Sequence, residues 1–348
     1  MIAPNPILGT GFHAIGGMAA SSCYTPSSKV KQWSWGSFWL VQATFAWVLM
    51  PLLIGYLTVP GFFRILHDAP SNVVWGAFAL GAVYGFGGMS FGLAIKHIGY
   101  SLTYTIAIGL SAVIGTITPL LINGTFHDYF SSEGSGIIIL GMALSVLGVV
   151  ICGWAGFRKE KDLKEVNGSR FKMLTGLLLA IVGGVLSAVF NLSLEQGQPI
   201  AEMAAKNGAG HFEQNAKMIV STGGCYVVNL IWFLVLGIKE KTLKEFTSKS
   251  GLSLALRFRN FAWSALAGTL WIMQFFFYGI GHIRMGKFQF ISWVLHMSML
   301  IFFSYFVGVV MKEWKQVSRK TYALLIVGLF VLVASFIIMT WGSVIGNS

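Results

Sequence analysis

The sequence predicts an all-α integral membrane protein with ten transmembrane helices, arranged as two inverted-topology repeats of five helices each. Three observations predict this class: a scarcity of charge, a series of long apolar runs and a one-sided distribution of basic residues. Of the 348 residues, 55% are hydrophobic and 10% are charged, and the mean hydropathy is +0.72. Because a soluble domain carries about 25% charged residues, this chain has too few charges to cover a surface that faces water.

The apolar runs are the second observation. A helix needs about 20 mostly apolar residues to cross a bilayer, and ten stretches of the chain meet this requirement. They are residues 5–26, 37–59, 72–95, 101–122, 135–156, 172–195, 215–237, 260–282, 288–310 and 321–342. The remaining length leaves no room for a soluble domain.

The basic residues indicate the orientation of these helices. Nineteen of the 24 Lys and Arg residues lie in the loops that follow the first, third, fifth, seventh and ninth runs. Loops rich in Lys and Arg stay in the cytoplasm, so we expect both termini on the periplasmic side of a bacterial inner membrane. The net charge of +12 would suggest nucleic acid as the partner of a soluble protein. Here the basic loops border the membrane, and anionic lipid is the expected partner.

Weak internal similarity predicts the repeats. Ala14-Ile15-Gly16-Gly17 resembles Ile181-Val182-Gly183-Gly184, and three glycines recur with the same spacing in both halves. These are Gly81, Gly92 and Gly99 in the first half and Gly268, Gly279 and Gly286 in the second. We expect a first repeat at 1–156, a cytoplasmic linker at 157–171 and a second repeat at 172–348. Since five is odd, the second repeat enters the membrane from the opposite side, as in secondary transporters with a site between inverted repeats.

Carboxylates avoid the apolar runs. Glu160 and Glu313 fall in expected inner loops, and Glu195, at the outer end of the sixth run, is the debatable case. Because ionisable residues inside a membrane are usually functional, this distribution argues against a carboxylate relay deep in the membrane. It also argues against a site for a buried organic cation.

Four polar side chains are expected at a similar depth. His13 lies 16 residues before Lys29, and His296 lies 16 residues before Lys312. At the α-helical rise, both are about 24 Å from the inner face. The same measure places Gln274 and Asn191 at about 22 and 28 Å. The other interpretation of each residue is a structural hydrogen bond between helices.

Aromatic residues complete the candidate binding residues. Trp271, Tyr278 and Trp293 lie in the eighth and ninth runs, and their flat rings suit the apolar face of a pyranose. Sugar hydroxyls suit Gln, Asn and His, which donate and accept hydrogen bonds. A histidine titrates near neutral pH, which suits proton coupling, although sodium coupling stays open. We find no catalytic constellation, phosphate-binding loop, metal-ligand spacing or cofactor motif, so we do not expect an enzyme.

Seven motifs occur along the chain: KVKQWSW (29–35), TIAIGLS (105–111), GTITP (115–119), ING (122–124), QFFFYGIGH (274–282), ISWVLHMS (291–298) and KEW (312–314). By these motifs, the chain resembles the L-rhamnose–proton symporter family of the drug/metabolite transporter superfamily. The resemblance implies ten helices in two inverted halves, inward symport of L-rhamnose with a proton, and a central cavity lined by helices 1, 3, 4, 6, 8 and 9. His13, Asn191, Gln274 and His296 lie on four of these six helices.

The combined interpretation is a proton-coupled importer of a 6-deoxyhexose, L-rhamnose. Gln274 and Asn191 would hydrogen-bond the sugar, and a ring of Trp271, Tyr278 or Trp293 would cover its face. His296, or else His13, would carry the proton. The alternatives are an exporter of drugs or metabolites, a transporter of a different sugar with sodium coupling, and a membrane sensor without transport.

Overall fold

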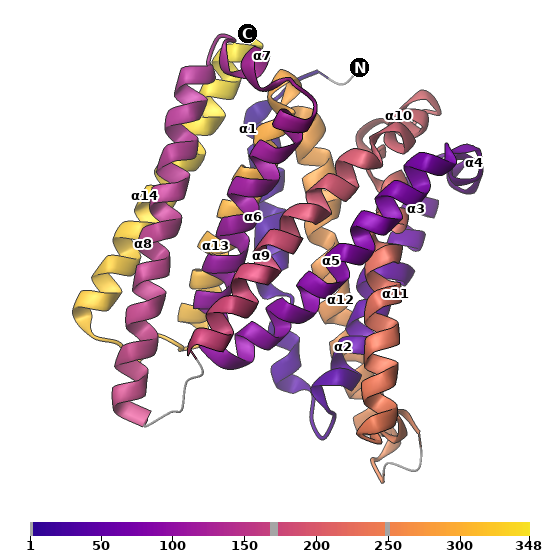
Figure 1. Cartoon of the computed structure of the whole chain (residues 1–348), viewed down its shortest axis with the longest axis vertical. Helices are drawn as coiled ribbons and strands as arrows, with labels where there is room; N and C mark the ends of the chain where they lie inside the picture. Colours follow the sequence, from indigo (N-terminus) through magenta and orange to yellow (C-terminus); the bar gives the residue numbers. More distant parts are fainter. Residues whose placement is uncertain (1–2, 168–172, 248–250) are drawn as a thin grey trace. The chain divides into compact units, whose positions relative to one another are not determined.

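The computed structural model describes residues 3–167, 173–247 and 251–348, and every regular element in these ranges is helical (Figure 1). The all-α class is therefore confirmed. The longer helices are α1 (Pro6–Ser22), α5 (Ser71–Ile98), α6 (Tyr100–Ile122), α8 (Ser135–Asn167), α9 (Met173–Gln196), α11 (Asn215–Lys239), α12 (Leu254–Arg284), α13 (Ser292–Val310) and α14 (Arg319–Asn347). The shorter ones are η1 (Thr25–Lys29), α2 (Trp35–Thr44), η2 (Phe45–Leu49), α3 (Met50–Thr58), α4 (Phe62–Asp68), α7 (Phe126–Phe130), α10 (Gln198–Lys206), η3 (Gly210–Phe212), η4 (Thr242–Phe246) and η6 (Gly286–Ile291).

Nine helical stretches of the described chain are long and apolar enough to cross a membrane. They correspond to nine of the ten runs expected from the sequence. Among them, α2, the π-helical η2 and α3 form one continuous stretch, Trp35–Thr58. The run expected at 5–26 is not confirmed as a span, because α1 ends at Ser22 after 17 residues. This length is at the lower limit for crossing a bilayer.

Helix α8 extends further than the sequence predicts. Its apolar run was expected to end at 156, where a linker would begin, but the helix continues to Asn167. The added segment is rich in Lys and Glu, which are good helix formers, so the charge does not interrupt the helix. The rest of the expected linker, 168–171, lies outside the described residues.

By its internal contacts, the described chain forms two compact units. Unit 1 comprises Met1–Ser21, Gly87–Leu192 and Ile280–Ser348, and unit 2 comprises Ser22–Phe86 and Ser193–Gly279. The boundaries fall within α1, α5, α9 and α12, so each of these helices contributes residues to both units.

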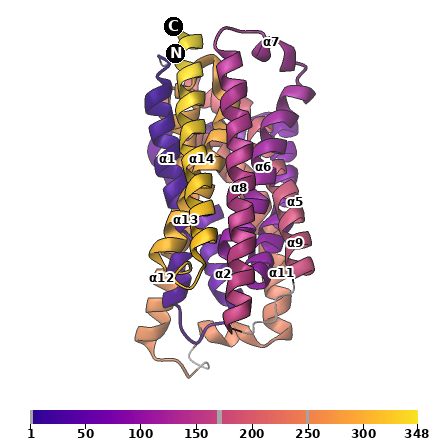
Figure 2. The same cartoon turned by 90° about the vertical axis from the view of Figure 1, so that its left-hand side faces the viewer.

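In unit 1, α8 and α14 pack against each other along most of their length (Figures 1 and 2). Glycines bring the two backbones close: a β-carbon at Gly141 would lie 2.9 Å from the backbone nitrogen of Met339, and one at Gly148 would lie 3.1 Å from that of Leu332. Small residues permit such approach in lipid, where burial of apolar surface does not drive helix association. The α8–α14 pair therefore depends on glycine at these positions.

We predict that Gly141→Ala lowers the thermal stability of the purified protein, because the new methyl group meets backbone that cannot rotate away. Overpacking of this kind costs about 1–3 kcal/mol. The matched control is Gly136→Ala on the same helix, where a β-carbon would meet nothing within 4 Å. A melting temperature for Gly141→Ala at or above that of Gly136→Ala would contradict the prediction.

Helices α6, α9 and α13 also contribute to the interior of unit 1. A β-carbon at Gly184 of α9 would lie 2.6 Å from the carbonyl oxygen of Ala107 in α6, so these helices cross closely there. Helix α13 packs along α6. Its residues from Ser292 to Ile301 are all buried, which explains why no polar face is visible in this part of the sequence.

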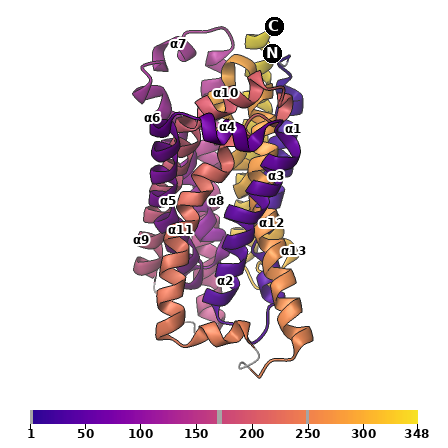
Figure 3. The ribbon, with the colours of Figure 1, turned by 90° about the vertical axis from the view of Figure 1, so that its right-hand side faces the viewer.

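Unit 2 is built around α11, which packs against α2, η2 and α3. The indole nitrogen of Trp39 donates to Asn229 of α11 at 3.0 Å, and the Asn229 amide donates to the carbonyl of Gly85 at 3.1 Å. The short helices α4 and α10 lie together beside α11 (Figure 3). They bury an apolar cluster that includes Phe62 and Ile200.

Candidate functional site

Two buried histidines meet inside unit 1. The ring centroids of His13 in α1 and His296 in α13 are 5.6 Å apart, with the ring planes at 69°. Both side chains are completely buried. Glycine makes this approach possible, since a β-carbon at Gly17 of α1 would lie 3.1 Å from the backbone nitrogen of Leu300 in α13. The two imidazoles thus form one group, which the matching depths of the two residues suggested.

A third imidazole, His282 near the end of α12, belongs to the same surroundings. It is buried and interacts electrostatically with His13. The neighbouring Gly281 gives room for His13, because a β-carbon there would lie 3.0 Å from its ring. His282 ends the expected eighth helix and was not among the residues predicted from the sequence. Its position directly after Gly281 in the GIGH motif was the available signal.

Trp293 lies one helical turn before His296 on α13. Its indole nitrogen donates to the carbonyl oxygen of Ser111 in α6 at 2.9 Å, and its side chain is buried. Gly115, one turn further along α6, accommodates the ring: a β-carbon there would lie 2.8 Å from Trp293 Cδ1 and closer still to Nε1. The orientation of Trp293 is therefore fixed by α6.

Asn191 of α9 reaches the same part of α6. Its Nδ2 donates to the carbonyl oxygen of Gly115 at 2.9 Å. Its Oδ1 is buried and has no hydrogen-bond partner within the described residues. Because an unsatisfied buried acceptor costs about 1–3 kcal/mol, this oxygen is suited to accept from a ligand hydroxyl. Buried hydroxyls without a partner in the described chain also occur at Ser111, Thr116 and Ser292.

The other predicted binding residues belong to unit 2. Trp271, Gln274 and Tyr278 are buried and lie along one face of α12. The Trp271 ring packs edge-on against Trp47 at 5.6 Å and lies 5.1 Å from Phe275. The structure thus places the seven predicted residues in two groups: four in unit 1 and three in unit 2.

Buried charged residues occur in both units and were not predicted from the sequence. Lys159 and Glu160 are buried in α8, so the expected position of Glu160 in an inner loop was wrong. In unit 2, Lys217 is buried and its Nζ donates to Gln198 Oε1 at 2.8 Å. Lys217 falls inside the expected run 215–237, whereas Lys159 and Glu160 fall in a charged segment that was expected to be a linker.

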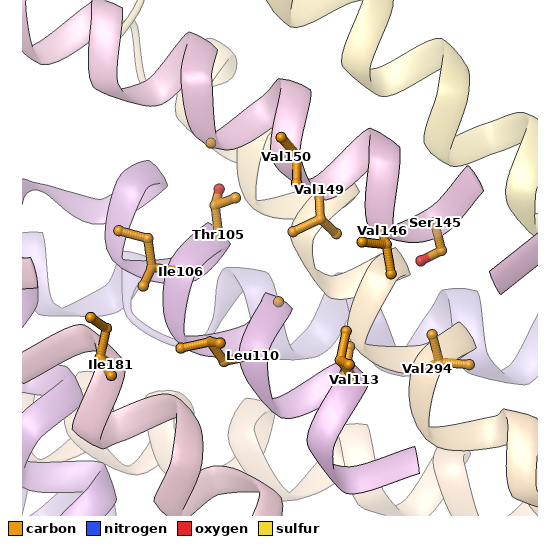
Figure 4. Close-up of a pocket in the computed structure, with 13 residues that line it drawn as sticks. Thr105, Ile106, Leu110, Val113, Ser145, Val146, Val149, Val150, Ile181 and Val294 are labelled. Carbon is orange, nitrogen blue, oxygen red and sulfur yellow. The ribbon is translucent and has the colours of Figure 1, made fainter. Parts of the chain in front are cut away.

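A cavity of about 390 Å³ in unit 1 contains none of the predicted binding residues (Figure 4). It lies between α6 and α8 and is also lined by Ile181 and Val294. Apart from the hydroxyls of Thr105 and Ser145, its lining is aliphatic or glycine. Burying a sugar hydroxyl without a partner costs several kcal/mol, so this cavity does not suit a polar sugar.

Comparison with known proteins gives matches along nearly the whole chain. A family model described as L-rhamnose-proton symport protein (RhaT) matches residues 3–344. A Yersinia pestis (strain Pestoides F) protein named L-rhamnose-proton symporter is 31% identical over 331 residues, covering 94% of this chain and 95% of that protein. A protein of the same name from Escherichia coli O17:K52:H18 (strain UMN026 / ExPEC) is 32% identical over 339 residues, covering 96% and 97%.

Proposed function

We propose that this chain, which belongs to the family of L-rhamnose-proton symport proteins, imports L-rhamnose together with a proton. The observation that carries the proposal is the match of the family model to residues 3–344. The nine membrane-length helices agree with a multi-pass protein of the bacterial inner membrane. Membership in this family makes the chain a transporter rather than an enzyme.

The architecture that we propose has ten transmembrane helices, with α1 as the first, in two inverted repeats at 1–156 and 172–348. Weak similarity between the halves supports it. The first residues of α1 and the last residues of α14 lie at the same end of unit 1 (Figures 1 and 2), as an even number of crossings requires. We place this end in the periplasm and the basic loops against anionic lipid at the cytoplasmic face, following the distribution of Lys and Arg.

For the sugar, we propose hydrogen bonds from Asn191 and Gln274 and an apolar contact from Trp271, Tyr278 or Trp293. Asn191 has the strongest support, since its buried Oδ1 has no partner within the described residues and sugar hydroxyls are donors. Trp293 would offer its ring face, because its indole nitrogen already donates to Ser111.

For the proton, we propose the His13–His296 pair. Two imidazolium rings 5.6 Å apart in a buried site would repel each other, so the pair carries one proton at a time. A protonated ring donates from both nitrogens and strengthens sugar binding from the periplasm. Loss of the proton to the more alkaline cytoplasm weakens the site and releases the sugar there.

The decisive experiment is uptake of labelled L-rhamnose into proteoliposomes with an imposed pH gradient, with and without a protonophore. One pH unit is worth about 1.4 kcal/mol, so it supports about tenfold accumulation at one proton per sugar. We expect accumulation that collapses with protonophore. Accumulation that follows a sodium gradient instead would contradict proton coupling. If neither gradient drives uptake, a counterflow panel of sugars identifies a different substrate, and failure of all of them removes the importer proposal.

A further inference from the structure

The inner end of unit 1 contains an unusual group of charged side chains. Lys159 Nζ lies 2.8 Å from Glu313 Oε2 and 3.5 Å from Glu160 Oε1. The side chains of Lys159 and Glu160 are 3% and 6% exposed, and that of Glu313 is 27% exposed. Ser101, at the start of α6, donates to Glu313 Oε2 at 3.3 Å. We call Lys159, Glu160, Glu313 and Ser101 the charged cluster.

The backbone after α13 brings Glu313 into the cluster. Lys312 has a left-handed conformation, with φ of 64°, and the amide of Glu313 donates to the carbonyl of Gly308 at 2.9 Å. This arrangement resembles a helix C-cap, which turns the chain back on the last helical turn. Glu313 is thereby fixed to the end of α13, the helix that carries Trp293 and His296.

The charges in the cluster do not balance. Two carboxylates share one ammonium group, so the fully ionised cluster has a net charge of −1 in a largely buried site. Removing an ionised carboxylate from water costs several kcal/mol unless it is paired, and two carboxylates at one site resist simultaneous ionisation. Glu313 has the shorter contact with Lys159 and the hydroxyl of Ser101, which leaves Glu160 as the group that binds a proton.

Within the described residues, the charged groups that act on Glu160 are Lys159 and Glu313. The neighbouring helix α5 carries Lys96 and His97 in its last turn. From its own helix, Lys159 and Cys152 face this region, and from α13 the phenol of Tyr305 does. The Tyr305 hydroxyl is occupied, since it donates to the carbonyl of Cys152 and contacts Thr105 Oγ1, each at 2.6 Å.

Two further features lie next to the cluster. Trp314 packs beside Lys159, whose Nζ is 5.3 Å from its ring centre, and its buried Nε1 has no hydrogen-bond partner in the described chain. Glu160 lies against Gly99, which has φ of 78° and directly precedes the first residue of α6. A β-carbon at Gly99 would be 2.7 Å from Glu160 Oε1, so the carboxyl group touches the α5–α6 turn directly.

We propose that Glu160 is a second proton-binding residue of the transport cycle. When the Glu160 carboxyl loses its proton to water at the inner face, the new carboxylate competes with Glu313 for Lys159. This competition weakens the link between α8 and the end of α13, and reprotonation restores it. The inference rests on the proton symport proposed above but not on the assignment of the coupling proton to His13 and His296.

The test compares Glu160→Gln, which imitates the protonated form, with Glu240→Gln, an exposed carboxylate at the end of α11. Both variants are assayed in proteoliposomes for L-rhamnose counterflow and for accumulation driven by a pH gradient. We expect Glu160→Gln to retain counterflow within about twofold of wild type and to lose the pH dependence of its rate. With a gradient of one pH unit, we also expect its accumulation ratio to be about tenfold below that of wild type. This is the ratio expected when no gradient is imposed. Glu240→Gln should behave as wild type.

Wild-type accumulation and pH dependence in Glu160→Gln would overturn the inference while leaving symport intact, whereas failure of wild type to accumulate sugar would remove the symport proposal itself. If Glu160→Gln does not fold, Glu160→Asp serves instead, because it keeps a carboxyl group. The infrared band of a protonated carboxyl should be present in wild type at neutral pH and shifted in Glu160→Asp. An unshifted band would also overturn the inference.

Discussion

Replacing both His13 and His296 with glutamine is expected to remove concentrative, pH-dependent uptake of L-rhamnose. Glutamine keeps a donor and an acceptor of hydrogen bonds but does not take up a proton near neutral pH. The rings are completely buried and 5.6 Å apart, so each can carry the proton when the other is absent. For this reason, we expect single replacements to lower accumulation less than the double replacement does.

The measurement is the ratio of internal to external sugar across an imposed gradient. With one pH unit, the ratio should fall from about ten to about one in the double variant, while counterflow persists. His67→Gln is the matched control, since His67 is an exposed residue of α4. Unchanged accumulation and pH dependence in the double variant would show that another group carries the coupled proton. His282 and Glu160 would be the next residues to replace.

Much of the fold could be predicted because the apolar runs and the helical rise are local properties. Nine of the ten expected runs correspond to membrane-length helices. Counting residues from Lys29 and Lys312 put His13 and His296 at one height, and the structure brings their rings together. The estimate treats each segment as one continuous helix, although α1 ends at Ser22 and the chain reaches Lys29 through η1.

Contacts between distant segments could not be predicted in this way. Lys159 and Glu313 are 154 positions apart in the chain, and nothing in either local sequence shows that they pair. The charged end of α8 resembled a loop because the local composition shows the charges of a segment but not its burial in the folded chain. The orientation of Trp293 likewise depends on Gly115 and Ser111 of another helix.

Gly115→Ala is expected to have the second large effect, because three helices meet at this glycine. Its carbonyl accepts from Asn191 of α9, and a methyl group at its α-carbon would press on the Trp293 ring of α13. Relieving the clash moves the indole away from Ser111, and such overpacking costs about 1–3 kcal/mol. Since alanine is a better helix former than glycine by about 1 kcal/mol, a loss of stability would reflect packing and not helix propensity.

We expect Gly115→Ala to lower the rate of L-rhamnose counterflow at least about tenfold, which corresponds to about 1.4 kcal/mol, with a lower melting temperature. Gly136→Ala, where the β-carbon meets open space, is the control for both measurements. Normal counterflow in Gly115→Ala would show that the Asn191–Gly115–Trp293 contacts serve packing alone. Adding Trp293→Phe to Gly115→Ala separates packing from sugar binding, because the smaller ring relieves the clash. Recovery of stability without recovery of counterflow would assign the indole ring itself to the sugar.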